Sequence, residues 1–157
     1  MISQPTQLMN LTKALESAIE DLEQLAKKKS PHPSRFHARD ILVPLGTLAA
    51  ADLPFPRDEL VTRLTRLTEP FAERWQRAVN EELQLACAEF VTSVDEHYLE
   101  LDNYDFDYTT TARERLGARL LACELLSCEV APKLTEQIER ADLIYAPYRE
   151  KYEKGRG

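Results

Sequence analysis

The sequence predicts an all-α fold, an antiparallel helical bundle of four main helices with one or two short helices. Apolar residues recur at steps of three and four over long stretches, which is the period of an amphipathic helix. No stretch longer than four residues reads as a strand. A chain of 157 residues that is 43% hydrophobic and 30% charged can bury a core, which predicts a single domain over residues 1–157.

The first main helix is predicted over residues 6–29. Thr6 is a suitable N-cap, and the three lysines at 27–29 put positive charge at the C-terminal end. Leucine and alanine recur along one seam at Leu8, Leu11, Leu15, Ala18, Leu22 and Leu25. Two prolines predict a loop after this helix, and the short helices are expected near residues 38–51 and 57–68.

The long stretch 69–101 is predicted to be the helix around which the chain is organised. One face carries Trp75, Val79, Leu83, Ala86, Phe90, Val94, His97 and Leu101. Pro70 is expected in the first helical turn, where its missing N–H leaves no bond unmade. Because His97 lies in the apolar stripe, we expect it to be buried and structural.

Residues 102–108 break the helical pattern, and the next main helix is predicted over 109–130 with a threonine cap. This stretch is very apolar, yet Arg119, Glu124 and Glu129 follow one another at intervals of five and so point in different directions. A buried helix cannot hold unpaired charges. We therefore expect one of these charges to be paired inside the protein, or the helix to be distorted near Ser127.

The helices 69–101 and 109–130 are predicted to form an antiparallel hairpin. Counting back from the bend pairs Cys87 with Cys123, Phe90 with Leu120, and Ser93 with Gly117. Gly117, which lacks a Cβ, is then the expected point of closest approach. The last main helix is predicted over 132–153, with a proline at its first position and a kink or restart at Pro147.

The charge of the chain is uneven, and this asymmetry limits its partners. Residues 1–68 hold nine Lys/Arg against eight Asp/Glu, whereas residues 69–157 hold eleven against nineteen. A negative field repels nucleic acid and anionic membranes and favours cationic partners. No segment reads as membrane-spanning or as a signal peptide. Three cysteines, an odd number without a CxxC pair, indicate a cytoplasmic location.

An acidic ridge is the first candidate interaction surface. Its predicted members are Glu82, Glu89, Glu96 and Glu100 along one arc of the long helix, with Asp102, Asp105 and Asp107 at its end. The hairpin brings Arg113 and Arg115 level with Glu96 and Glu100, which leaves most of the ridge unneutralised. The ridge is therefore either a solvated acidic face or a docking face for a basic partner.

A seam of tyrosines in the last helix is the second candidate surface. Tyr145, Tyr148 and Tyr152 follow the seam that begins at Leu134. Tyrosine is enriched in interface hot spots. The alternative is that these rings close the end of the core and keep their hydroxyls in water.

The sequence predicts no catalytic residue, no metal site and no cofactor. A carboxylate-bridged metal pair needs Glu-x-x-His on two helices, whereas His97 and Glu100 give one motif in the reverse order. The leading hypothesis is a protein-protein interaction module, an adaptor or regulator, that docks a basic surface of another protein. The alternatives are an acidic nucleic-acid mimic that inhibits a DNA- or RNA-binding protein and, as a minority hypothesis, a carboxylate-histidine metalloenzyme.

Overall fold

The computed structural model describes residues 4–52 and 54–156, without the side chains of residues 4, 5, 96, 97 and 156. This part of the chain contains helices and no strand, which confirms the predicted all-α bundle. The elements are α1 (Gln4–Ala26), α2 (Arg35–Ala50), α3 (Arg57–Thr68), the 3-10 turn η1 (Glu69–Phe71), α4 (Ala72–Ser93), α5 (Glu96–Leu99), α6 (Phe106–Leu126) and α7 (Pro132–Arg156).

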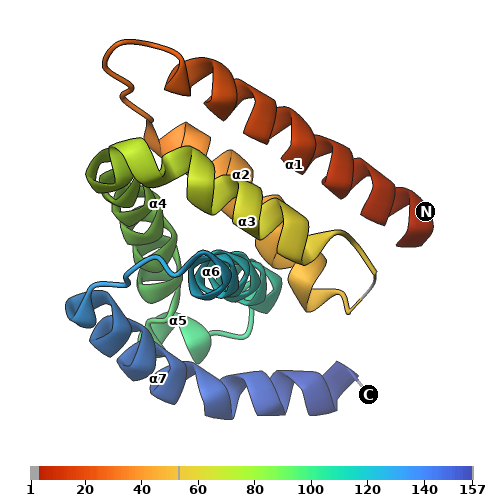
Figure 1. Cartoon of the computed structure of the whole chain (residues 1–157). Helices are drawn as coiled ribbons and strands as arrows, with labels where there is room; N and C mark the ends of the chain where they lie inside the picture. Colours follow the sequence, from red (N-terminus) through yellow and green to blue (C-terminus); the bar gives the residue numbers. More distant parts are fainter. Residues whose placement is uncertain (1–3, 53, 157) are drawn as a thin grey trace.

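The helices α1, α2 and α3 run in alternating directions, and α1 packs against both of the others (Figure 1). Figure 1 views α6 almost along its axis, so α6 crosses these three helices steeply. The helix α2 packs against α1, α4 and α6. The centre of the fold is therefore α2, which the sequence predicted only as a short helix.

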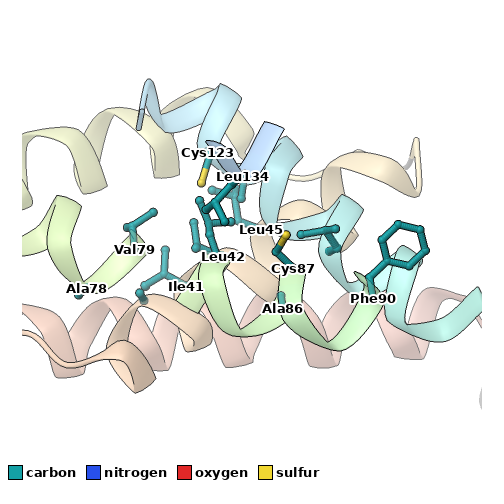
Figure 2. Close-up of a cluster of buried hydrophobic side chains, with 14 of the residues drawn as sticks. Ile41, Leu42, Leu45, Ala78, Val79, Ala86, Cys87, Phe90, Cys123 and Leu134 are labelled. Carbon is teal, nitrogen blue, oxygen red and sulfur yellow. The ribbon is translucent and has the colours of Figure 1, made fainter. Parts of the chain in front are cut away.

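The core is formed by one cluster of buried apolar side chains to which all the longer helices contribute. Figure 2 shows part of it: Ile41, Leu42 and Leu45 of α2 lie among Val79, Cys87 and Phe90 of α4, Cys123 of α6 and Leu134 of α7. Burial of such side chains is the main source of folding free energy.

The helix α2 begins earlier than predicted because of a cap that the sequence reading missed. The ring nitrogen Nδ1 of His37 accepts a hydrogen bond from the backbone N–H of Ser34 at 3.0 Å. Histidine thus replaces the Glu or Gln of an ordinary capping box. Residues 35–37, predicted as loop, therefore belong to α2, and Pro44 lies inside the helix.

Of the two glycines, Gly46 of α2 and not Gly117 lies at a close helix approach. A Cβ placed on Gly46 would lie 1.8 Å from the backbone oxygen of Ala118 in α6. A Cβ on Gly117 would meet only the Nη1 atom of Arg113, at 3.4 Å. The expectation for Gly117 is wrong because α6 turns that residue away from α4 and presents its neighbour Ala118 to α2.

The long helix predicted over 69–101 is interrupted. Its first residues form η1, α4 ends at Ser93, and a separate single turn, α5, follows. The run Val91-Thr92-Ser93-Val94 is rich in β-branched residues, which restrict side-chain rotamers in a helix. At the break, the hydroxyl of Tyr104 donates to the free carbonyl of Ser93. The bonding of this helix end is therefore supplied from outside the helix.

The hairpin of α4 and α6 is antiparallel as predicted, but its register is shifted. The hydroxyl of Thr109 faces the carbonyl of Ser93 at 3.4 Å, eight residues before the predicted partner Gly117. Cys87 and Cys123 do share one buried cluster (Figure 2). The shift arises mainly because α4 ends at Ser93, eight residues before the predicted end at 101. The helix α6 also begins earlier, at Phe106, where Asp105 instead of a threonine caps the helix by accepting from the N–H of Tyr108 at 3.3 Å.

The remaining helix ends differ from prediction by a few residues. The helix α1 ends at Ala26, before the lysines, and α6 ends at Leu126 because Ser127 adopts the left-handed conformation with φ of 56°. The expected distortion near Ser127 is thus confirmed. The helix α7 continues to Arg156 without the restart expected at Pro147, and its ribbon bends along its length in Figure 1.

Candidate functional site

Glu82, the first member of the predicted ridge, lies inside the protein. Its side chain is 1% exposed, and its two carboxylate oxygens bind two arginines. Oε2 lies 3.1 Å from Nη1 of Arg35 at the start of α2, and Oε1 lies 3.2 Å from Nε of Arg119 in α6. The expectation that Glu82 faces solvent is therefore wrong, because α2 and α6 cover this part of α4. The paired charge expected inside the protein is Arg119.

The rest of the ridge divides into two groups. Glu89, Glu100, Asp102, Asp105 and Asp107 are exposed. Glu89 lines one surface hollow together with Asp105 and Asp107, and Arg115 lines it as well. Glu100 and Asp102 line a second hollow beside α7. The side chains of Glu96 and His97 are outside the described residues, so the expectations for both stay predictions.

Arg113 does not neutralise the ridge. Its guanidinium binds both carboxylate oxygens of Asp142 in α7, at 2.8 and 3.1 Å, and lies over the ring of Phe90. Arg113, which the predicted hairpin places level with Glu96 and Glu100, is thus bound to Asp142 of α7. Instead, the hydroxyl of Tyr148 donates to Glu100 at 3.2 Å.

The tyrosine seam also divides, because α7 is covered at one end and open at the other. Tyr145 is buried, with its ring edge-to-face against Phe90 at 5.8 Å between centroids and its hydroxyl bonded to Thr110. It belongs to the core, and its predicted place at an interface is wrong. Tyr148 and Tyr152 are half-buried. The ring of Tyr152 stacks on Phe106, with centroids 5.1 Å apart.

The two candidate surfaces meet in one hollow of about 500 Å³ between α5, the start of α6 and α7. We call it the aromatic-acidic hollow. It is lined by Leu99, Glu100, Leu101, Asp102, Phe106, Tyr148, Lys151, Tyr152 and Gly155. Residues from the predicted ridge and residues from the predicted tyrosine seam therefore face the same space, although 46 to 52 positions separate them in sequence.

The hollow combines an apolar floor with a negative rim. Leu99 is 3% exposed and Leu101 is 40% exposed, so leucine surface continues from the core to solvent. The carboxylates of Glu100 and Asp102 lie beside it, with one cation, Lys151, on the opposite helix. Such a site suits a ligand group that has an aliphatic or aromatic part and a positive end.

Sequence reasoning missed Phe106, Leu99 and Lys151 as parts of the hollow. A usable signal was the alternation of aromatic and acidic residues over 104–108, Tyr-Asp-Phe-Asp-Tyr. The rings of Tyr104 and Phe106 meet edge-to-face at 5.1 Å between centroids, and Phe106 then stacks on Tyr152. This aromatic row anchors the end of α7 to the start of α6.

Among the side chains that the structure describes, no three His, Cys, Asp or Glu residues are grouped to hold a metal ion. No helix within the described ranges is long and apolar enough to cross a membrane. Comparison of the chain with protein-family models, with curated proteins and with solved structures finds no match.

Proposed function

We propose that this chain is a cytoplasmic protein-protein interaction module, an adaptor or regulator, that docks a basic segment of another protein in the aromatic-acidic hollow. The observation that carries the proposal is the convergence of the acidic residues Glu100 and Asp102 with Tyr148 and Tyr152 around exposed leucine surface. Neither group alone distinguishes a docking site from an ordinary solvated face. Together they combine the aromatic anchors and the charged rim that interfaces use.

The chemistry of the hollow indicates the partner segment. A lysine or arginine side chain can place its alkyl stem on Leu101 and Tyr152 and its charge beside Glu100 and Asp102. The aromatic faces add cation-π attraction. Because a hollow of about 500 Å³ lies within the range of sites for small ligand groups, one or two side chains fill it. The partner therefore presents a basic residue next to an apolar one.

The surrounding field supports such a partner. The second part of the chain carries the whole negative excess, nineteen Asp/Glu against eleven Lys/Arg over residues 69–157. A field of this sign increases the rate at which a basic segment arrives. The three cysteines form no disulfide, which agrees with the cytoplasmic location proposed from the sequence.

The test is a peptide-display selection on the purified chain, followed by measured binding of the selected peptides. We expect peptides with Lys or Arg beside a leucine or an aromatic residue to be enriched. Their binding should be lost in the double variant E100K/D102K. The matched control is E16K/E20K, which makes the same charge change at two exposed positions of α1, a helix far from the hollow in Figure 1.

Equal loss of binding in both double variants would contradict docking in the hollow, because the peptides would then sense only the net charge. Nucleic acid that competed at another surface would lower peptide binding in the wild type and in both variants. It therefore cannot account for a loss of binding that is confined to E100K/D102K. A selection that yields no basic peptides at all would also sink the proposal.

A further inference from the structure

The C-terminal end of α6 brings two cysteines and the only tryptophan of the chain together. The left-handed Ser127 ends the helix, the backbone N–H of Cys128 donates to the carbonyl of Cys123 at 2.9 Å, and that of Ser127 donates to Glu124 at 3.3 Å. This pair of bonds defines a Schellman motif, in which the side chains of the first and last residues are frequently in contact. Here those residues are Cys123 and Cys128, and each thiol shifts the pKa of the other.

The segment that carries Cys128 is held in place by α4. The side-chain amide of Gln76 donates to the backbone oxygen of Glu129 at 2.9 Å and accepts from its N–H at 3.0 Å. Trp75, the neighbour of Gln76, is 5% exposed, and its indole lowers the pKa of the Cys128 thiol. Cys128 is half-buried, whereas Cys123 is fully buried. One cysteine of the pair is thus partly exposed to solvent, and the other is not.

We propose that Cys123 and Cys128 are a peroxide-sensitive thiol pair, which hydrogen peroxide converts into a disulfide across the end of α6. Cys128 is the sulfur that reacts with peroxide, because it is the partly exposed member of the pair. Cys123 is the sulfur that resolves the product. Cys87 is buried in the core beside Gln137 and takes no part.

The local hydrogen bonds favour the thiolate at Cys128. The S–H of Cys123 and the indole N–H of Trp75 lower the pKa of the Cys128 thiol, against the opposing effect of burial. The same contact raises the pKa of Cys123, since its proton is shared with Cys128, and burial raises it further. The two sulfurs therefore differ as the reaction requires, because the thiolate is the nucleophile.

The reaction balances in two steps. The Cys128 thiolate attacks one oxygen of hydrogen peroxide, the O–O bond breaks, and the departing hydroxide takes up a proton to become water. Cys128 is now a sulfenic acid and no longer holds the proton of Cys123 in place. The sulfur of Cys123 then attacks that of Cys128, the S–O bond breaks, and the hydroxide leaves as water with the Cys123 proton. Both thiols are oxidised, and the peroxide is reduced to two water molecules.

The test treats the whole purified chain with hydrogen peroxide, alkylates the remaining thiols and digests with trypsin. Cleavage after Arg119 and Lys133 places Cys123 and Cys128 in one peptide, residues 120–133, whereas Cys87 falls in residues 78–113. We expect the peptide 120–133 to lose two hydrogen atoms and escape alkylation, and dithiothreitol to reverse both changes. Cys128 should react at least about tenfold faster than Cys87, the internal control.

The fluorescence of Trp75, the single tryptophan, gives a second measurement, because a neighbouring disulfide quenches an indole. Quenching should appear with peroxide in the wild type and in Cys87→Ser, and should be absent in Cys128→Ser. In Cys123→Ser, dimedone should trap the sulfenic acid at Cys128. If Cys123→Ser does not fold, Cys128→Ser, a substitution at a half-buried position, still provides the comparison with the wild type.

Three results would overturn the proposal. The first is a peptide 120–133 that keeps two alkylated thiols under conditions that oxidise Cys87. The second is a disulfide between two chains through Cys128. The third is sulfinic acid that accumulates at Cys128 in the wild type without any bond to Cys123, because Cys123 would then not be resolving.

Discussion

The Nε atom of Arg119 lies 3.2 Å from Oε1 of Glu82, inside the contact between α4 and α6. Arg119 also donates from Nη1 to the backbone oxygen of Arg115 at 2.9 Å, and Arg35 satisfies the second oxygen of Glu82. Glu82 and Arg119 are both nearly inaccessible. Three elements, α2, α4 and α6, are therefore joined through one carboxylate.

Glu82→Ala is expected to lower the free energy of unfolding by about 3 kcal/mol, since Arg119 would remain buried without its partner. Urea unfolding monitored by circular dichroism measures this change. The matched control is Glu89→Ala, seven residues along the same helix and exposed, which should change the stability by no more than about 0.5 kcal/mol. Equal effects of the two substitutions would show that the ion pair does not hold the helices together.

Gly46→Ala is expected to destabilise the fold by about 3 kcal/mol, because α2 and α6 must move apart to admit the methyl group. The Cβ would lie 1.8 Å from a backbone oxygen, which cannot turn away as a side chain can. Gly117→Ala is the matched control. It meets only the flexible end of Arg113 at 3.4 Å and should stabilise α6 by about 0.5–1 kcal/mol. Thermal melting of the two variants tests the pair, and an unchanged melting temperature for Gly46→Ala would contradict the close approach.

Tyr104→Phe is expected to cost about 1–2 kcal/mol, because the carbonyl of Ser93 loses the hydroxyl that ends α4. Thr109, which is bonded to the same hydroxyl, lies 3.4 Å from that carbonyl and replaces it only in part. The control is Tyr108→Phe, whose side chain is 57% exposed and whose stability should match the wild type. Chemical unfolding of both variants decides the matter. A neutral Tyr104→Phe would mean that the interruption after Ser93 does not depend on this bond.

The fold class followed from the sequence because apolar periodicity depends on local geometry alone. Helix ends were less predictable, since each is set by one bond: His37 to Ser34 at the start of α2, or Tyr104 to Ser93 at the end of α4. The stretch Val91–Asp95 could have signalled the interruption, because its β-branched residues are followed by an aspartate suited to capping a new turn.

The candidate site was predicted in part. Exposed carboxylates and tyrosines were recognised as residue types, but Glu82 and Glu89 are equivalent in a helical pattern because seven residues make almost two full turns. What separates them is the tertiary cover: Arg35 and Arg119 reach Glu82, whereas Glu89 lines an open hollow. The hydrogen bond between Tyr148 and Glu100 depends on where α7 lies relative to α5. The spacing of residues within one helix does not determine that position.

The rim of the aromatic-acidic hollow is expected to act on the association rate of a bound basic peptide. Replacing both rim carboxylates, as E100Q/D102N, should slow association by about tenfold at low salt and flatten its salt dependence, because exposed charges act mainly on the encounter. Stopped-flow or surface-based kinetics with a peptide from the selection measures both. Slower association that keeps the full salt dependence would place the steering charges elsewhere.

The leucine floor is expected to act on the dissociation rate instead. Leu101 is 40% exposed and lines the hollow, so Leu101→Ser should keep the fold and remove apolar contact with the peptide. Dissociation should become about tenfold faster while association stays nearly unchanged, since most contact energy in related complexes appears in the dissociation rate. Leu143→Ser is the matched control, because Leu143 of α7 is 77% exposed and lies outside the lining of the hollow. If both serine variants release the peptide equally fast, the hollow is not where the peptide binds.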